Sequence, residues 1–166
     1  LGPIRSVPIT PFHFGPGAAI HAIAPRRVSF LAFCAANVLI DIEPLYYMLT
    51  RQYPLHRLFH TYAGATAVAA CTVALFLVAR PFNLPNLLGW KSLTPFQVSA
   101  GASIGVYSHV ALDSLMHRDI RPFSPFSEAN PLLHTVNVSS LYWFCLSAGL
   151  VGLCILGIRR LARRPQ

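Results

Sequence analysis

Acidic residues are scarce in this chain, and charged residues of any kind are few. Only 5 of the 166 residues are Asp or Glu, and all charged types together make up 11%. Hydrophobic residues make up 54%, and the mean hydropathy is +0.52. Soluble domains carry about 25% charged residues. The composition therefore excludes an ordinary soluble protein and indicates an integral membrane protein.

Motifs of several other protein classes are also missing. The formal net charge is +8, but the basic residues gather at the ends of apolar segments and form no recognition motif or basic stripe, which argues against nucleic-acid binding. The four cysteines lie inside apolar runs without C-x-x-C spacing, so we expect buried core residues rather than a disulfide or zinc site. No cleavable signal peptide is visible.

Long apolar segments are what the chain does contain, and together they predict an all-α membrane-embedded helical bundle. About 20 apolar residues suffice to cross a bilayer, and we expect four spans: Val28 to Leu49, Tyr62 to Ala79, Pro95 to Met116 and Leu141 to Ile158. Pro11 to Ala24 is shorter and contains Gly and Pro, which indicates a half-length helix or a re-entrant segment. We assign residues 10–166 to one domain and treat residues 1–9 as an extension that can be foreign to the native chain.

Basic residues are divided unevenly between the two ends of these segments. One end carries Arg51, Arg57, Arg118 and Arg121. The other end carries Arg26, Arg27, Arg80, Lys91, Arg159, Arg160, Arg163 and Arg164. Since cytoplasmic loops are enriched in Lys and Arg, we expect the second end in the cytoplasm. The first end would then be periplasmic in a bacterium with two membranes. All five acids then lie on the non-cytoplasmic face.

Eight residues that can bind a metal lie where three apolar segments end. An unpartnered carboxylate there costs several kcal/mol, and a divalent metal would neutralise the acids while using the histidines as neutral ligands. The residues are Asp41, Glu43, His56, His60, His109, Asp113, His117 and His134. Because separate segments place them on one face, we predict that they form one metal site.

The third apolar segment carries the most informative spacing. His109, Asp113 and His117 are four residues apart, so they would share one face of a helix. A His-x3-Asp pair on a helix can place an imidazole and a carboxylate on one metal ion. The alternative is that His109 makes a polar contact with Ser108 or Asn37, and that Asp113 pairs with an arginine.

Two further pairs belong to the first segment and the loop after it. Asp41 and Glu43 are followed at once by Pro44, which predicts a helix end where both carboxylates can turn to a common site. One of them could instead cap the loop or bind Arg57. His56 and His60 have the spacing of helical zinc ligands, with a buried polar pair as the alternative.

Two histidines lie in the short N-terminal segment. If this segment descends from the outer face, His13 is level with the other candidate ligands. His21 is then about 12 Å deeper, from the 1.5 Å rise per helical residue. We therefore expect His13 at the site and His21 in a packing or hydrogen-bonding role.

Five short motifs follow one another over about residues 10 to 135: Phe12-His13, Leu39-Ile40-Asp41-Ile42-Glu43-Pro44, His56-Arg57-Leu58-Phe59-His60-Thr61, Ser108-His109-Val110-Ala111-Leu112-Asp113 and Pro122-Phe123-Ser124-Pro125-Phe126. In this order they resemble the YdjM-like family of bacterial inner-membrane metal-dependent hydrolases. The resemblance implies a remote likeness to zinc phospholipase C. It also implies a metal site at His13, Asp41, Glu43, His56, His60, His109 and Asp113.

The chain departs from the family pattern in two places. The pattern reads H-R-G-x-T-H with histidines five residues apart, whereas His56 and His60 are four apart and the Gly is absent. Glu43 stands where Asp is commoner, which keeps the carboxylate but lengthens its reach.

The metal site and the resemblance together predict hydrolysis at the non-cytoplasmic face. One or two divalent ions, zinc before manganese, would activate a bound water. The general base would be Glu43 or Asp113, whichever of the two is not a ligand. Arginines beside the site can hold a phosphate, so we expect a phosphoester of a lipid or lipid-linked molecule as the substrate. The alternative for these arginines is headgroup anchoring. They are Arg57, Arg118 and Arg121.

Two other functions are open at this point. The protein could bind or transport a divalent metal, or it could be an assembly subunit whose metal is structural. Transport is disfavoured because the ionisable residues cluster at one end of the segments, so no polar path crosses the membrane.

Overall fold

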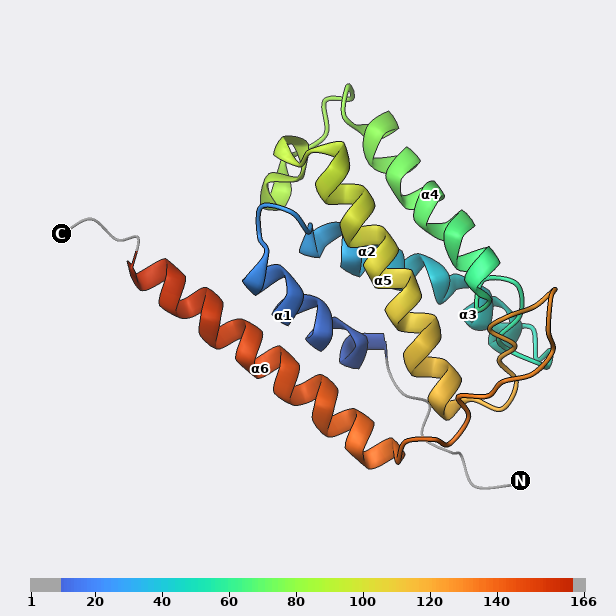
Figure 1. Ribbon diagram of the computed structural model, residues 1–166. Helices are drawn as coiled ribbons and strands as arrows, with labels where there is room; N and C mark the ends of the chain where they lie inside the picture. The colour runs from blue at the N-terminus through green and yellow to red at the C-terminus, as the bar shows by residue number, and fades with distance from the viewer. Residues whose placement is uncertain (1–9, 163–166) are drawn as a thin grey trace.

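The computed structural model describes residues 10–162, and all regular secondary structure in that range is helical (Figure 1). This confirms the predicted all-α class. The expected extension at residues 1–9, together with Arg163 and Arg164, lies outside the described residues. The elements are η1 (Thr10–His13), α1 (Phe14–Ile23), α2 (Phe30–Ile40), α3 (Ile42–Leu49), α4 (Tyr62–Ala79), η2 (Leu87–Ser92), α5 (Pro95–Met116) and α6 (Val138–Ala162).

Three helical stretches are long and apolar enough to cross a membrane: Phe30–Leu49, which combines α2 and α3, Tyr62–Ala79 and Val138–Ala162. The predicted fourth span, α5, is not among them, so the count of four is not confirmed. Helix α5 packs between α2 and α4, and 10 of its 22 residues are buried. Its polar side chains therefore contact other helices and not lipid. Such a helix can be less hydrophobic than one that faces lipid.

The first span is interrupted at Asp41, three residues before the position predicted from Pro44. Helix α2 ends at Ile40 and α3 begins at Ile42, so Pro44 lies in the first turn of α3. First-turn N–H groups have no acceptor within a helix, so a proline there loses no hydrogen bond. The prediction of a helix end at Pro44 was wrong for this reason. The interruption leaves the Asp41 side chain at a helix terminus, beside α5.

Helices α2 and α5 run in the same direction and approach closely at Gly105. A Cβ atom at Gly105 would lie 2.8 Å from the carbonyl oxygen of Phe33 and 3.0 Å from Nδ2 of Asn37. Glycine therefore permits a backbone approach that a larger residue would prevent. This approach sets Asn37 and Asp41 against the two turns of α5 that carry His109 and Asp113.

Helix α4 packs on the other side of α5, and buried apolar side chains fill the space between α2, α4 and α5. Its N-terminus is capped by Thr61, whose Oγ1 accepts a hydrogen bond from the Gly64 N–H at 2.9 Å. The N–H of Tyr62 donates to the carbonyl of Pro122 at 2.8 Å, which ties the start of α4 to the loop after α5. His60, one residue before the cap, is thereby fixed near the end of α5.

The short N-terminal helix runs parallel to α6 (Figure 1). Its contact with α6 is close, because a Cβ at Gly15 would overlap the carbonyl oxygen of Cys145. The segment begins beside the end of α5 with His13 and ends at the turn that carries Arg26 and Arg27. It therefore connects the end of the molecule with the candidate ligands to the end rich in arginine.

Candidate metal centre

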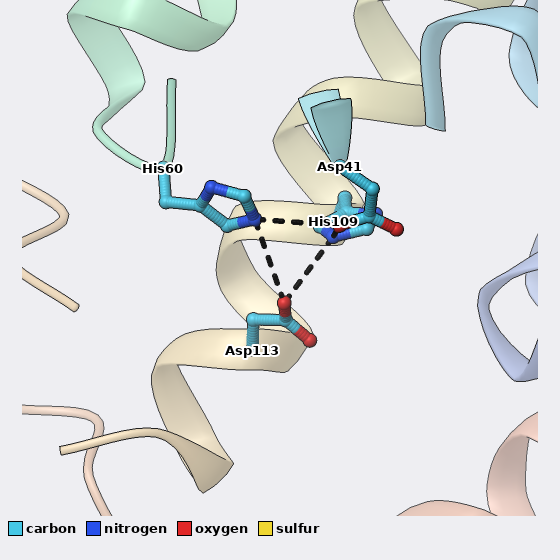
Figure 2. Close-up of side chains that lie close together, drawn as sticks. All are labelled: Asp41, His60, His109 and Asp113. Carbon is cyan, nitrogen blue, oxygen red and sulfur yellow. Dashed lines mark ion pairs between the residues drawn. The ribbon is translucent and has the colours of Figure 1, made fainter. Parts of the chain in front are cut away.

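Four side chains from three parts of the chain meet near the end of α5 (Figure 2). Nε2 of His109 lies 3.2 Å from Oδ1 of Asp41 and 3.2 Å from Oδ2 of Asp113. Nε2 of His60 lies 3.6 Å and 3.7 Å from the same two oxygens. Both rings and Asp113 are buried. We call these residues the four-donor group.

The separations fit a single metal ion. Zinc binds imidazole nitrogen and carboxylate oxygen at about 2.0–2.2 Å, so neighbouring ligands of a tetrahedral site lie about 3.3–3.6 Å apart. The four measured separations run from 3.2 to 3.7 Å, and all four donor atoms lie within 4.8 Å of one another. Two nitrogens and two oxygens make a donor set suited to Zn²⁺ and compatible with Mn²⁺.

Hydrogen bonds do not satisfy all the buried polar atoms of the two histidines and Asp113. Buried atoms without a hydrogen-bond partner include both ring nitrogens of His60, Nε2 of His109 and Oδ1 of Asp113. Protonating every ring would place like charges close together, because the His109 ring centre is 4.3 Å from that of His13 and 5.4 Å from that of His60. Neutral rings facing a cation avoid that repulsion.

The ring of His109 is held from behind by Asn37. Nδ1 lies 2.9 Å from Oδ1 of Asn37, and Nδ2 of Asn37 donates to the carbonyl of Phe33 at 2.9 Å. Since the amide nitrogen is the donor there, Oδ1 accepts, and Nδ1 of His109 carries the proton. Nε2 then offers its lone pair to the four-donor group. The polar contact considered as an alternative to metal binding is thus compatible with it and orients the ring.

Glu43 lies behind His60 rather than within the four-donor group. Its Oε2 is 3.6 Å from Nδ1 of His60 and accepts backbone N–H bonds from Arg57 at 3.1 Å and Phe59 at 2.9 Å. A carboxylate at the far nitrogen of a ligating imidazole fixes the ring and increases its basicity. This geometry gives Glu43 a supporting place beside the site.

A second group shares Asp113 with the first. His56, Asp113 and His117 each offer a donor atom, and the three atoms lie within 4.8 Å of one another. The rings of His56 and His117 are 4.5 Å apart between centres. Burial lowers the pKa of His117 below its usual value, and the opposing attraction of Asp113 for the proton is smaller. A neutral imidazole is the form that binds metal. We call these residues the three-donor group.

The backbone at His117 differs from the prediction that this residue shares one helix face with His109 and Asp113. Helix α5 ends at Met116, and His117 has an extended backbone with φ −103° and ψ 125°, so it does not continue the helix face of Asp113. His56 and His60 lie in the irregular loop before α4. Their i, i+4 spacing is therefore not on a helix, in keeping with their predicted place in the loop after the first segment. One ring belongs to each donor group, although the two ring centres are only 4.6 Å apart.

Asp119 supports His56 and is not among the site residues predicted from the sequence. Both carboxylate oxygens lie 3.1 Å from Nδ1 of His56, and Oδ2 accepts the backbone N–H bonds of Leu55 and His56 at 3.0 and 3.2 Å. Burial by itself raises the pKa of Asp119, but the bonds from His56 outweigh it and hold the pKa well below its usual value. The feature of the sequence that could have pointed to Asp119 is the pattern His117-x-Asp119 directly after an apolar segment.

An open cavity of about 730 Å³ adjoins the three-donor group, with His56 and Asp119 in its wall. The same wall contains all three arginines that the sequence analysis assigned to substrate binding: Arg57, Arg118 and Arg121. The cavity therefore joins a basic wall to the edge of the candidate metal centre.

The remaining predicted residues differ in their placement. His13 is buried, and its Nε2 lies 3.2 Å from Oδ1 of Asp113, although His13 is in neither donor group. His134 is exposed on the loop after α5, and neither group contains it. Nδ1 of His21 lies 2.7 Å from the carbonyl oxygen of Val28, consistent with its expected hydrogen-bonding role.

Comparisons with known proteins agree with the motif resemblance. Residues 10–164 match the family described as YdjM inner membrane protein, which is nearly the whole chain. No curated protein and no solved structure was found to match, so the likeness to zinc phospholipase C stays a prediction. The family and the three apolar helices together indicate a membrane location. The chain belongs to the YdjM inner membrane protein family.

Proposed function

We propose that this protein is a metal-dependent hydrolase of the bacterial inner membrane that cleaves a phosphoester of a lipid or lipid-linked molecule. The observation that carries this proposal is the sharing of Asp113 between the four-donor group and the three-donor group. The first group has a complete ligand set, whereas the second adjoins an open cavity. A catalytic metal characteristically has three protein ligands and one position for water or substrate.

Divalent metals bound in such a pair would lower the pKa of a water molecule and polarise the scissile phosphoryl group. The chain itself supplies charge balance and orientation. Asp113 offers a carboxylate to both groups. Glu43 accepts two backbone hydrogen bonds behind His60, so it acts as a positioning residue. Of the two predicted general bases, Asp113 lies in both donor groups and would be a ligand, whereas Glu43 lies in neither.

The composition of the cavity wall supports a phosphorylated lipid as the substrate. Guanidinium groups bind phosphate oxygens by paired hydrogen bonds, and three arginines line the cavity. Tyr53 and Leu58 belong to the same wall and are 75% and 63% exposed. Exposed apolar side chains in the cavity wall suit an acyl or polyprenyl chain better than a water-soluble phosphoester.

His117→Ala tests the proposal because it removes a ligand from the three-donor group alone. We expect hydrolysis of a phospholipid or polyprenyl-phosphate substrate to fall by about 100-fold or more, as when a transition-state contact is lost. Metal bound at the four-donor group should be retained. The measurements are substrate cleavage in detergent and elemental analysis of protein purified without chelators. His134→Ala is the matched control, since this exposed histidine lies outside both groups, and it should keep wild-type activity and metal content.

Asp113→Asn should remove activity and most of the bound metal, because both groups lose their shared carboxylate. Wild-type protein that neither retains nor takes up stoichiometric zinc or manganese would refute the metal centre. If the wild type binds metal but cleaves no phosphoester in a broad lipid screen, the metal is structural and the hydrolase proposal fails.

A further inference from the structure

A second pocket lies at the opposite end of α1 and α6 from the metal centre. Its volume is about 590 Å³, and its wall consists of Ile23, Ala24, Pro25, Arg26, Arg27 and Arg159. Helix α1 alone separates the two ends by about 15 Å, from ten residues at 1.5 Å each. No residue of this wall belongs to a donor group or to the cavity of the proposed substrate.

The pocket is formed by a tight turn set against the last turns of α6. The N–H groups of Arg27 and Val28 both donate to the carbonyl of Ala24, at 2.9 and 3.0 Å. His21 adds a side-chain hydrogen bond to the carbonyl of Val28 at 2.7 Å. This bonding holds Arg26 and Arg27 at a fixed place, and the parallel packing of α1 on α6 brings Arg159 beside them.

Among residues 10–162, the positive charge of this pocket has no acidic side chain nearby. All five acids of the chain lie in or around the segments at the metal-centre end: Asp41, Glu43, Asp113, Asp119 and Glu128. The ends of α1 and α6 each contribute roughly half a negative charge through the helix dipole. Three full positive charges therefore exceed what the two helix ends offset, and the excess favours an anion.

Apolar side chains lie at the same helix ends as the pocket, and we call them the apolar rim. Ile23 belongs to the pocket wall and is 68% exposed. Ile158 and Leu161 lie within two residues of Arg159 on α6 and are 67% and 65% exposed. The outer face of α6 continues this surface along the membrane span. A ligand that fills the pocket and also covers the rim would therefore combine an anionic group with hydrocarbon chains.

We propose that this pocket binds the phosphate of an anionic phospholipid headgroup, with the acyl chains lying along α6. Basic pockets at the cytoplasmic ends of membrane helices are suited to such headgroups. Inorganic phosphate offers the same anionic chemistry, but it would leave the apolar rim in contact with water. The site is independent of the proposed hydrolase activity.

Arg159→Gln and Arg160→Gln form a matched pair for testing this site. Both remove one positive charge from the same turn of α6, but only Arg159 lines the pocket. The probe is phosphatidylglycerol added to purified protein in neutral detergent, with the affinity measured by native mass spectrometry. We expect Arg159→Gln to weaken binding by about fivefold, the equivalent of one basic contact with an anionic headgroup. Arg160→Gln should leave the affinity unchanged.

Two further measurements identify the ligand. Phosphatidylcholine should bind at least tenfold more weakly than phosphatidylglycerol, and millimolar inorganic phosphate should not displace the lipid. The double variant Arg26→Gln/Arg27→Gln is altered only at exposed turn positions. It should weaken phosphatidylglycerol binding more than Arg159→Gln does. If Arg159→Gln and Arg160→Gln weaken phosphatidylglycerol binding equally, the lipid is attracted by diffuse positive charge and not by the pocket. That result would overturn the proposal. Displacement by inorganic phosphate would likewise overturn the assignment to a lipid.

Discussion

Three of the histidines in the two donor groups have a polar side chain beside the ring that supports them. The support is an amide for one ring and a carboxylate for two others, and in every case it approaches Nδ1. Such supports orient the ligating nitrogen and strengthen its binding. The pairs are His109 with Asn37, His60 with Glu43, and His56 with Asp119.

The donor histidines could be predicted from the sequence more readily than the side chains that support them. A histidine or carboxylate at the end of an apolar segment is costly unless it has a partner, so its presence is informative by itself. Asn37 carries no charge and lies within an apolar run, where it could equally serve helix packing. Only the approach of α2 to α5 at Gly105 reveals that its amide faces His109.

Glu43→Gln distinguishes a supporting carboxylate from a metal ligand. The substitution keeps the size of the side chain but removes the charge behind His60. Loss of such a support typically weakens metal binding about 10–100-fold, and we expect zinc affinity to fall within that range. Affinity can be measured by competition with a chromophoric chelator, and the melting temperature should change little at saturating zinc.

Asp41→Asn is the comparison for this prediction, because Oδ1 of Asp41 belongs to the four-donor group. It should weaken zinc binding more than Glu43→Gln does. Equal losses in the two variants would make Glu43 a direct ligand, as the sequence analysis proposed.

At the scale of elements, the apolar segments predicted the helices well and their interruptions poorly. The predicted segments agree with α4 and α5 at both ends, since hydrophobic length is a direct requirement of membrane or core helices. We predicted the interruption at Pro44, but it lies at Asp41. The reason is that proline is tolerated in the first turn of a new helix, which is where Pro44 lies. Loop geometry, which sends His56 and His60 to different groups, has no sequence period that could predict it.

Gly105→Ala tests whether the approach of α2 to α5 positions the metal centre. The added Cβ would lie 2.8 Å from the Phe33 carbonyl oxygen, so the helices must separate, at a cost of about 1–3 kcal/mol. We expect a lower melting temperature and weaker zinc binding, because Asn37 moves away from His109. Gly157→Ala is the control, since a Cβ there meets nothing within 4 Å. It should be neutral or stabilise α6 by up to about 1 kcal/mol. Equal melting temperatures for the two variants would contradict this account of the helix contact.

At the scale of the whole molecule, the ionisable groups are distributed between two ends with different chemistry. Metal donors and acids lie at one end, and a pocket with three arginines lies at the other. Within the described residues, both candidate metal groups belong to the first end, so they form no series of sites through the bundle. That distribution disfavours a metal transporter, which needs sites along its path. It suits an enzyme whose substrate reaches one membrane surface.

The same distribution predicts the orientation of the protein. The eight Lys and Arg that the sequence analysis assigns to one end, against four at the other, predict the candidate metal centre on the non-cytoplasmic side. Single cysteines at the exposed positions Gln52 and Ser127, in a background where the four native cysteines are replaced, should react with a membrane-impermeant thiol reagent in intact spheroplasts. A cysteine at Leu88, in the exposed loop at the opposite end, should react only after lysis. The reverse labelling pattern would place the metal centre in the cytoplasm, where its substrate would have to be a phosphoester of the inner leaflet.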